Sequence, residues 1–173
     1  MVEQPRRWLN LKIPYFRNYW QEDSSLNIYI ASSLKNSEFN LSLERVLTRL
    51  GHNCFLPQRD ALLPTDALDS ENSGKLISER NIDGIMGADV ILVVGKDAGN
   101  DTSWEAGFAK ALSKPTILLC SKKDRVRKDL MIYFASDTVL EVEEDEKYSD
   151  ERLRSALMSI DYLSGDPEGE RSR

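Results

Sequence analysis

The chain has 173 residues, with 23 Lys and Arg against 29 Asp and Glu, which gives a formal net charge of −6. This length suits one domain, which can bury enough apolar surface to fold without disulfides. The negative charge argues against nonspecific binding to nucleic acid or to an acidic membrane. A small anionic ligand stays compatible with this composition, because a local pocket can oppose the global charge.

The cysteines, the single histidine and the N-terminus also exclude several classes of protein. Cys54 and Cys120 each lie in an apolar run, which is typical of reduced core cysteines. His52 is the only histidine, so we expect no zinc site, and we expect no cofactor. No apolar run approaches the ~20 residues of a membrane span, and no apolar segment follows Arg6 and Arg7 as in a secretory signal. We therefore expect a soluble, cytoplasmic protein.

The first half of the chain alternates strand and helix patterns after an aromatic-rich arm over residues 1–25. A β-rich run over residues 27–31 predicts a buried strand. Helical spacing of Leu43, Val46, Leu47 and Leu50 predicts a helix that stops at Gly51. A second strand is expected over residues 53–56, then a polar loop over 58–70 and a helix over 71–86.

The second half continues the same alternation. The run over residues 89–94 is apolar throughout, which indicates a central parallel strand covered on both faces. A loop over 95–101 precedes a helix that begins at Thr102 and buries one side. Strands are expected over residues 115–120 and 138–142, with a basic connector over 121–128 between them; the last strand is a candidate edge strand. A final helix carries Leu153, Ala156, Leu157 and Ile160, and residues 164–173 form a polar tail.

This alternation predicts one α/β catalytic domain over residues 26–163. We expect a doubly wound, Rossmann- or flavodoxin-like sheet of about five mainly parallel strands in a three-layer α/β/α arrangement. Ligands of such folds bind at the carboxyl ends of the strands. The informative residues are therefore those that follow the strands.

The segment after the third strand carries the strongest chemical signal. Gly99 in this loop allows a tight or left-handed backbone. With a helix that starts at Thr102, Glu105 lies in the first turn, where free N–H groups and the helix dipole keep a carboxylate ionised, as a nucleophile requires. The same residues also fit a capping box, with Thr102 as N-cap and Glu105 at the third helical position. Both interpretations stay open on this motif alone.

Five segments in order give the chain a resemblance to a known superfamily. They are Ile-Tyr-Ile-Ala at 28–31, Asn-Ile-Asp-Gly-Ile-Met-Gly-Ala-Asp at 81–89, Thr-Ser-Trp-Glu-Ala-Gly-Phe-Ala at 102–109, Lys-Pro at 114–115 and Asp-Leu-Met at 129–131. With these segments, residues 27–142 resemble the nucleoside 2-deoxyribosyltransferase superfamily, which includes base-exchanging transferases and 5′-nucleotide N-glycoside hydrolases.

The resemblance implies a role for several side chains. Glu105 matches the nucleophile, Tyr29 a tyrosine that positions it, and Asn81 a residue that contacts the leaving base. Gln58 falls in a loop that reads the base edge. Asp83 lies two residues after Asn81, roughly 200° round the helix, and is the weaker candidate there. Alternatives stay open: a core tyrosine, a helix-surface asparagine and an ordinary loop glutamine.

Two departures concern the sugar's 5′ end. Six residues before the nucleophile, the transferases carry an Asp and the nucleotide hydrolases a Ser, whereas this chain has Gly99; Asp97 or Asp101 could substitute. The segment with Asp129 and Met131 stands where transferases have Asn-Leu-Met, which reaches the sugar end of a neighbouring subunit's site. An Asp there would repel a 5′-phosphate.

A phosphate cradle is the opposing possibility for the same end of the substrate. Its candidates are Ser32, Ser33, Lys35 and Lys96, together with backbone N–H groups. Ordinary solvated loop residues would show the same pattern.

The resemblance implies an N-glycosidase or N-deoxyribosyltransferase in nucleotide metabolism such as purine salvage, with a nucleoside or nucleotide and a free nucleobase as small-molecule partners. We expect a covalent glycosyl-Glu105 intermediate on a 2′-deoxynucleoside, passed to another base or to water, in a homo-oligomer with shared active sites. A 5′-monophosphate N-glycoside hydrolase is the alternative. A nucleotide-binding sensor or an NAD-cleaving signalling module is a candidate of a different class.

Overall fold

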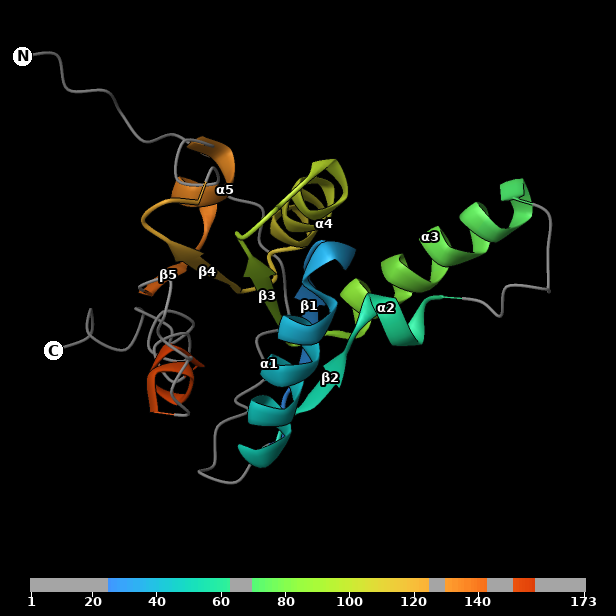
Figure 1. Ribbon diagram of the computed structural model, residues 1–173. Helices are drawn as coiled ribbons and strands as arrows, with labels where there is room; N and C mark the ends of the chain where they lie inside the picture. Colours follow the sequence, from blue (N-terminus) through green and yellow to red (C-terminus); the bar gives the residue numbers. More distant parts are fainter. Residues whose placement is uncertain (1–24, 63–69, 125–129, 143–150, 158–173) are drawn as a thin grey trace, which may run out of the picture.

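The computed structural model describes residues 25–62, 70–124, 130–142 and 151–157. The predictions of an aromatic arm and a polar tail concern residues that lie, except for Ser25, outside this part of the chain. The described residues form a five-stranded sheet in the order β2-β1-β3-β4-β5, and every neighbouring pair of strands is parallel (Figure 1). The strands are β1 (Asn27–Ala31), β2 (Asn53–Phe55), β3 (Val90–Val94), β4 (Thr116–Ser121) and β5 (Thr138–Val142). The α/β fold class, the five parallel strands and the edge position of β5 are thus confirmed.

The helices alternate with the strands. They are the 3-10 helix η1 (Leu34–Asn36), α1 (Ser37–Arg49), α2 (Pro57–Asp60), α3 (Ser70–Gly87), α4 (Asn100–Ala111) and α5 (Leu130–Ala135), followed by a helical segment over residues 151–157. Helix α1 ends as predicted, because Gly51 follows the cap residue Leu50 with a positive φ of 91°, a conformation that glycine adopts without strain.

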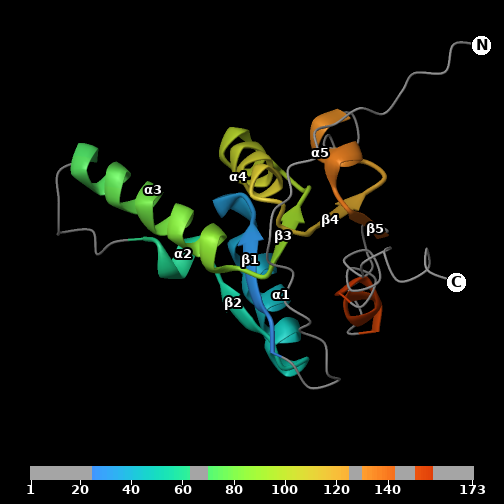
Figure 2. The ribbon, with the colours of Figure 1, turned by 180° about the vertical axis from the view of Figure 1, so that it is seen from behind.

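Alternation of side chains along the strands builds two cores, one on each face of the sheet. Ile28 and Ile30 face a core that includes Leu47 of α1 and Leu153 of the final helical segment. Tyr29 and Ala31 face the opposite core, which includes residues of α3, α4 and α5. Figures 1 and 2 show α1 and α4 on opposite faces, while the start of α3 extends beyond β2. Strand β3 is buried at all five positions, as its apolar sequence predicts.

Three local predictions were wrong. The expected loop after the second strand begins with a short helix, α2, which Pro57 can open because the first helical residue needs no N–H donor. Helix α5 was not expected at all. Helix α4 begins at Asn100, two residues before the predicted start, and this difference changes the environment of Glu105.

None of the helices in the described part of the chain combines the length and the apolarity that a membrane span requires.

Candidate active site

A buried tyrosine–glutamate pair is the centre of the site. Tyr29 lies on β1 and is fully buried, and Glu105 lies on α4 with 7% of its surface exposed. The hydroxyl of Tyr29 donates a hydrogen bond of 2.6 Å to Oε1 of Glu105. Because a buried carboxylate is costly without partners, this bond compensates part of the cost of placing Glu105 inside the fold.

The environment of Glu105 shifts its ionisation into the neutral range. Burial raises the pKa of Glu105 from 4.5 to about 7, the hydrogen bond from Tyr29 opposes this rise, and the nearby carboxylate of Asp101 adds to it. Burial and the neighbouring Glu105 also raise the pKa of the Tyr29 hydroxyl, which therefore stays a proton donor in the hydrogen bond. The expectation that Glu105 is held ionised by a helix terminus was wrong: it sits at the balance point between charged and neutral forms.

The start of α4 explains this outcome. The N-cap is Gly99 and the first helical residue is Asn100, so Glu105 falls in the second turn. Thr102 is buried inside the first turn and is not the N-cap, so the predicted capping box does not form. Asp101, rather than Glu105, is the acidic residue of the first turn. Glu105 therefore faces the sheet instead of the free N–H groups.

Asn81 supplies an unsatisfied polar atom on α3. Its side-chain Oδ1 is buried and has no hydrogen-bond partner among the described residues. Helix α3 contacts both β1 and α4, the elements that carry Tyr29 and Glu105. A buried acceptor without a partner costs free energy unless a ligand or a water completes it. Asn81 thus fits a group that binds a hydrogen-bond donor.

The loops after β1 and β3 are joined at the carboxyl edge of the sheet. The buried Asn36 donates a hydrogen bond of 2.7 Å to the carbonyl of Lys96, and a longer one of 3.4 Å to the Ser32 hydroxyl. The hydroxyl of Ser33 accepts from the backbone N–H of Lys35 and so caps η1. Asn36 was not among the predicted residues, and no sequence motif marks it.

The backbone of the β3–α4 loop differs from the expectation at Gly99. Gly99 is extended, with φ −114° and ψ −165°, whereas Asp97 takes the left-handed conformation with φ 51°. An aspartate tolerates that region better than most residues. A Cβ at Gly99 would meet no atom within 4 Å, so open space surrounds this position.

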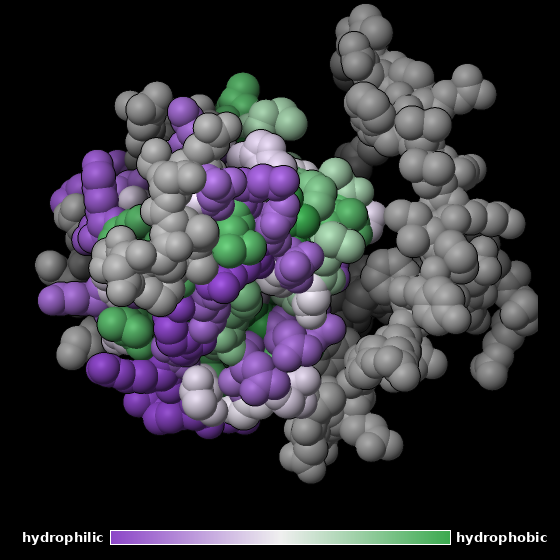
Figure 3. Space-filling model, turned by 90° about the vertical axis from the view of Figure 1, so that its right-hand side faces the viewer, coloured by the Kyte–Doolittle hydropathy of each residue, from purple (hydrophilic) through white to green (hydrophobic). Residues whose placement is uncertain are grey.

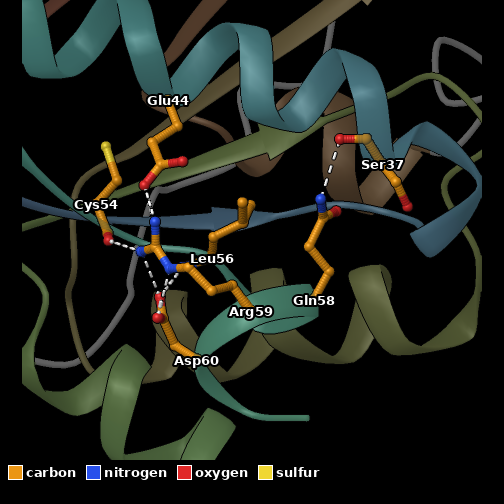
Figure 4. Close-up of polar contacts among 7 residues, drawn as sticks. All are labelled: Ser37, Glu44, Cys54, Leu56, Gln58, Arg59 and Asp60. Carbon is orange, nitrogen blue, oxygen red and sulfur yellow. Dashed lines mark hydrogen bonds and ion pairs between the residues drawn. The ribbon is translucent and has the colours of Figure 1, made fainter.

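Gln58 lies on α2 and is held by the protein on both sides of its amide. Its Oε1 accepts from Asn40 at 2.9 Å and its Nε2 donates to the carbonyl of Ser37 at 3.0 Å. Figure 4 shows the Ser37 contact beside a second anchor, in which the guanidinium of Arg59 bridges Glu44 and Asp60. Helix α2 is thus fixed against α1, at the end of β2 where the site was expected.

Asp83 lies away from the Tyr29–Glu105 pair. It is exposed and lines a surface cavity of about 610 Å³ along β2, together with Arg59, Arg80 and Gly84. Among the described residues that line this cavity, neither Tyr29 nor Glu105 occurs. Figure 3 looks at the molecule from this side and shows hydrophilic residues with smaller hydrophobic areas between them. The direction of Asp83 agrees with the helical angle that made it the weaker candidate.

The segment with the predicted neighbour contacts is only partly described. Asp129 lies outside the described residues. Met131 is on α5 and is 77% exposed, and it borders a groove of about 300 Å³ between α4 and α5. Leu130, Phe134 and Trp104 are also exposed, so a group of apolar side chains faces outward on these two helices.

Two residues that the sequence did not single out pack beside the pair, Phe55 against Tyr29 and Gly84 against Phe55. The ring of Phe55 on β2 stacks on the ring of Tyr29, with centroids 5.3 Å apart and an interplanar angle of 13°. Gly84 on α3 lies against Phe55, since a Cβ at that glycine would come within 2.9 Å of the ring. Only the strand register, which pairs Tyr29 with Phe55, could have indicated the stack.

Within residues 25–62, 70–124, 130–142 and 151–157, no three His, Cys, Asp or Glu side chains come together as metal ligands would.

Fold and site together define an α/β protein with a desolvated carboxylate at a hydrogen-bonded tyrosine, as an enzyme that works by nucleophilic or acid–base chemistry would have. The family described as nucleoside 2-deoxyribosyltransferase matches residues 28–158. The chain belongs to this family and is an enzyme of that kind, which acts as a deoxyribosyltransferase or N-glycosidase.

The chain also resembles several solved structures. A 2-deoxyribosyltransferase from Bacillus psychrosaccharolyticus is 26% identical with a TM-score of 0.58, and the match covers 73% of this chain and 95% of that one. A response regulator receiver protein from Burkholderia phymatum is 8% identical with a TM-score of 0.52, covering 80% and 96%, and this likeness shows the fold alone. A CMP N-glycosidase, BcmB, from Clostridium botulinum is 16% identical, covers 78% and 98%, and has a TM-score of 0.47, too low to support a conclusion. A comparison with curated protein sequences gives no match.

Proposed function

We propose that the chain cleaves the N-glycosidic bond of a 2′-deoxynucleoside through a covalent glycosyl-Glu105 intermediate. The observation that carries the proposal is the buried Glu105 carboxylate, hydrogen-bonded by Tyr29 and otherwise removed from solvent. Structural carboxylates of this kind normally pair with a cation or with several backbone N–H groups. Among the described residues, Glu105 has instead a single neutral donor in Tyr29, as a nucleophile that must stay reactive would have.

The reaction follows from the electrostatics of the pair. As the bond between C1′ and the base nitrogen breaks, its electrons move to the base and the sugar takes on oxocarbenium character. The Glu105 carboxylate is poorly solvated in the free enzyme, so a positive charge that develops beside it is stabilised more in the transition state than in the ground state. An oxygen of Glu105 then bonds to C1′, as in retaining glycosidases.

The second half of the reaction restores the enzyme. A ring N–H of a second base, or a water, attacks C1′, the bond between C1′ and Glu105 breaks to return the carboxylate, and the proton of the attacking group is released to solvent. A base as acceptor gives transfer and water gives hydrolysis. The Tyr29 hydroxyl holds the carboxylate in one orientation through both steps and keeps its own proton, because burial and Glu105 raise its pKa.

Asn81 is proposed to bind the leaving base. Its unpartnered Oδ1 can accept a hydrogen bond from a ring N–H or an exocyclic amine. An amide cannot donate a full proton to the departing nitrogen. A purine, which can be protonated elsewhere on its ring, is therefore the preferred leaving group, and a role in purine salvage follows from this preference.

The surroundings of the sugar's 5′ end favour a nucleoside. Gly99 offers no side chain to bind a phosphate, and Asp97 and Asp101 place negative charge in the same loop. Asp129 would add a further negative charge if its segment reaches a neighbouring site. Ser32 is a further polar residue proposed at this end, whereas Gln58 belongs to the proposed base end, where Asn40 and Ser37 orient its amide. Hydrolysis of a 5′-monophosphate, with Ser32 and Lys96 at the phosphate, is the alternative that the substrate test separates.

We also propose that two copies share their sites. Trp104, Leu130, Met131 and Phe134 are exposed apolar side chains on α4 and α5, two helices in contact, and a cluster of such side chains often marks an interface. A second copy of the chain is its proposed partner, with Met131 reaching the neighbour's sugar site. Light scattering that finds an active monomer would contradict this proposal. A cytoplasmic location also stays a prediction.

The test is incubation with purine and pyrimidine 2′-deoxynucleosides, ribonucleosides, 5′-monophosphates and NAD, each with and without a free acceptor base. Free base without acceptor indicates a hydrolase, and exchange that requires acceptor indicates a transferase. The Glu105→Gln variant keeps an acceptor for the Tyr29 hydroxyl but has no nucleophile, so it must lose activity. Base release that survives in this variant would overturn the proposal, and a chain inert toward every substrate would favour a nucleotide-binding sensor.

A further inference from the structure

The contact between Gly84 and Phe55 is unusually close. Gly84 lies within α3, and a Cβ built on it would be 2.9 Å from Cε1 of Phe55 and 3.0 Å from two other ring atoms. Real Cβ atoms do not approach carbon that closely, so only glycine permits this distance between the helix and the ring. Glycine inside a helix costs about 1 kcal/mol relative to alanine. The contact is therefore maintained against helix propensity.

The ring of Phe55 contacts Tyr29 as well as Gly84. Phe55 is the register partner of Tyr29 on the neighbouring parallel strand, and the two rings stack nearly parallel with centroids 5.3 Å apart. Phe55 thus lies between the backbone of Gly84 and the ring of Tyr29. A displacement of Phe55 away from Gly84 and toward β1 therefore presses on the tyrosine whose hydroxyl donates to Glu105.

Asn81 lies on the same helix as Gly84. Asn81 precedes Gly84 by three residues, so both lie on one face of α3. The close approach at Gly84 fixes how deeply this face of the helix sits over the sheet. The distance between Asn81 and the Tyr29–Glu105 pair therefore depends on a residue without a side chain.

We propose that Gly84 is a positioning residue, which through Phe55 sets the geometry of the Tyr29–Glu105 hydrogen bond and the depth of Asn81. The inference rests on the proposed function of these three residues. Gly84 touches no reacting atom and acts only through its neighbours.

The test compares two glycine-to-alanine changes on the same helix. Gly84→Ala adds a methyl group against Phe55, whereas Gly74→Ala adds one where no atom lies within 4 Å. Both changes raise helix propensity equally, so they differ only in the contact. The readout is the pKa of the Glu105 carboxyl, measured by ¹³C NMR of labelled glutamate as the pH is varied. The Glu105 signal is assigned by its loss in Glu105→Gln. This measurement does not require an active enzyme.

The titratable groups that act on Glu105 are Tyr29 from β1 and Asp101 from its own helix. A displaced Tyr29 hydroxyl lowers the pKa of Glu105 less, so Gly84→Ala must raise that pKa above the wild-type value, while Gly74→Ala leaves it unchanged. Equal titration curves in the three proteins would overturn the inference, whether or not the chain cleaves nucleosides. If Glu105 titrates near pH 7 in the wild type but the wild type releases no base, the proposed function is contradicted and the inference about Gly84 is not.

Kinetics supply a second readout where the wild type is active. A displacement of a few tenths of an ångström at the reacting groups should lower kcat roughly tenfold in Gly84→Ala, with the acidic limb of its pH profile moved to higher pH. The double variant Gly84→Ala/Phe55→Leu removes the ring that the methyl group strikes, so it should recover part of the loss. If Gly84→Ala alone fails to fold, a folded double variant still supports the contact, and a double variant that is no better than Gly84→Ala contradicts it.

Discussion

Replacement of Glu105 by glutamine should make the fold more stable above neutral pH while it abolishes base release. The reason is the raised pKa of Glu105, which burial moves from 4.5 to about 7. A glutamine has nearly the same shape and still accepts the hydrogen bond from Tyr29. A glutamine is neutral at every pH, however, so above neutral pH the variant avoids the free-energy cost of a charged carboxylate inside the protein.

The sign and the magnitude follow from proton linkage. Between pH 4.5 and about 7 the folded chain retains a proton that the unfolded chain has released, so wild-type stability falls as the pH rises through this window. At about 1.4 kcal/mol per pKa unit, the interval from 4.5 to about 7 corresponds to a loss of about 3 kcal/mol in the free energy of unfolding of the wild type. This loss is complete above pH 7. Near pH 4.5 the carboxyl is protonated in the folded state, and the advantage of the variant should be close to zero.

Urea denaturation of the wild type and Glu105→Gln at several values between pH 5 and pH 8 measures this difference. The free energy of unfolding of the variant should exceed that of the wild type by about 3 kcal/mol at pH 8 and by much less at pH 5. Glu79→Gln, on the exposed side of α3, is the matched control and should change stability by less than about 0.5 kcal/mol at either pH. An advantage of Glu105→Gln that is absent at pH 8, or equal at both pH values, would refute the reasoning.

Three further substitutions test single contacts. Tyr29→Phe removes the hydrogen-bond donor to Glu105, so the acidic limb of the pH profile of kcat should move above pH 7. The kcat itself should fall roughly tenfold to a hundredfold. An acidic limb that stays in place in steady-state assays would contradict this. Asn81→Asp places a proton donor at the proposed site of the leaving base. Chromatographic assays at mildly acidic pH should then show a higher ratio of pyrimidine release to purine release. An unchanged ratio would argue against contact between this residue and the base. Gly99→Ser has open space for its side chain, so it should change the free energy of unfolding by only a few tenths of a kcal/mol. It should raise kcat/KM for a 5′-monophosphate a few-fold relative to kcat/KM for the corresponding nucleoside. A decrease in this relative value would exclude the position from the 5′ end of the sugar.

The five strands could be predicted because each is a short apolar run bounded by polar or turn residues. Strand β3 is the clearest case, since burial on both faces removes any alternation and leaves an unbroken apolar sequence. Helices α1 and α3 followed from helical spacing. Helix α5 could not be predicted, because Leu130–Ala135 is apolar at every position while Ile132 is the buried one. Hydrophobicity alone does not tell an interface from a core.

The candidate site was only partly accessible from sequence. The resemblance placed Tyr29 beside Glu105, and the hydrogen bond between them is present. The sequence does not indicate a role for Phe55 or Gly84, because a phenylalanine in a strand and a glycine in a helix are common and carry no reactive group. Their importance depends on register and on the distance between a helix and a ring, and both are set by tertiary packing.

The first residue of α4 determines what Glu105 can do chemically. A start at Thr102 would have placed the carboxylate among free N–H groups, where it would be ionised at low pH and well solvated, hence stable and weakly nucleophilic. The start at Asn100 gives that place to Asp101 and turns Glu105 toward the sheet, where Tyr29 is its hydrogen-bond donor and burial raises its pKa to about 7. A carboxylate that loses solvation stabilises an oxocarbenium-like sugar more strongly, so the two-residue difference that breaks the capping box also gives Glu105 the environment that its proposed role requires. Helix boundaries are the least certain part of any sequence-based prediction, and here that boundary sets the pKa of the proposed nucleophile.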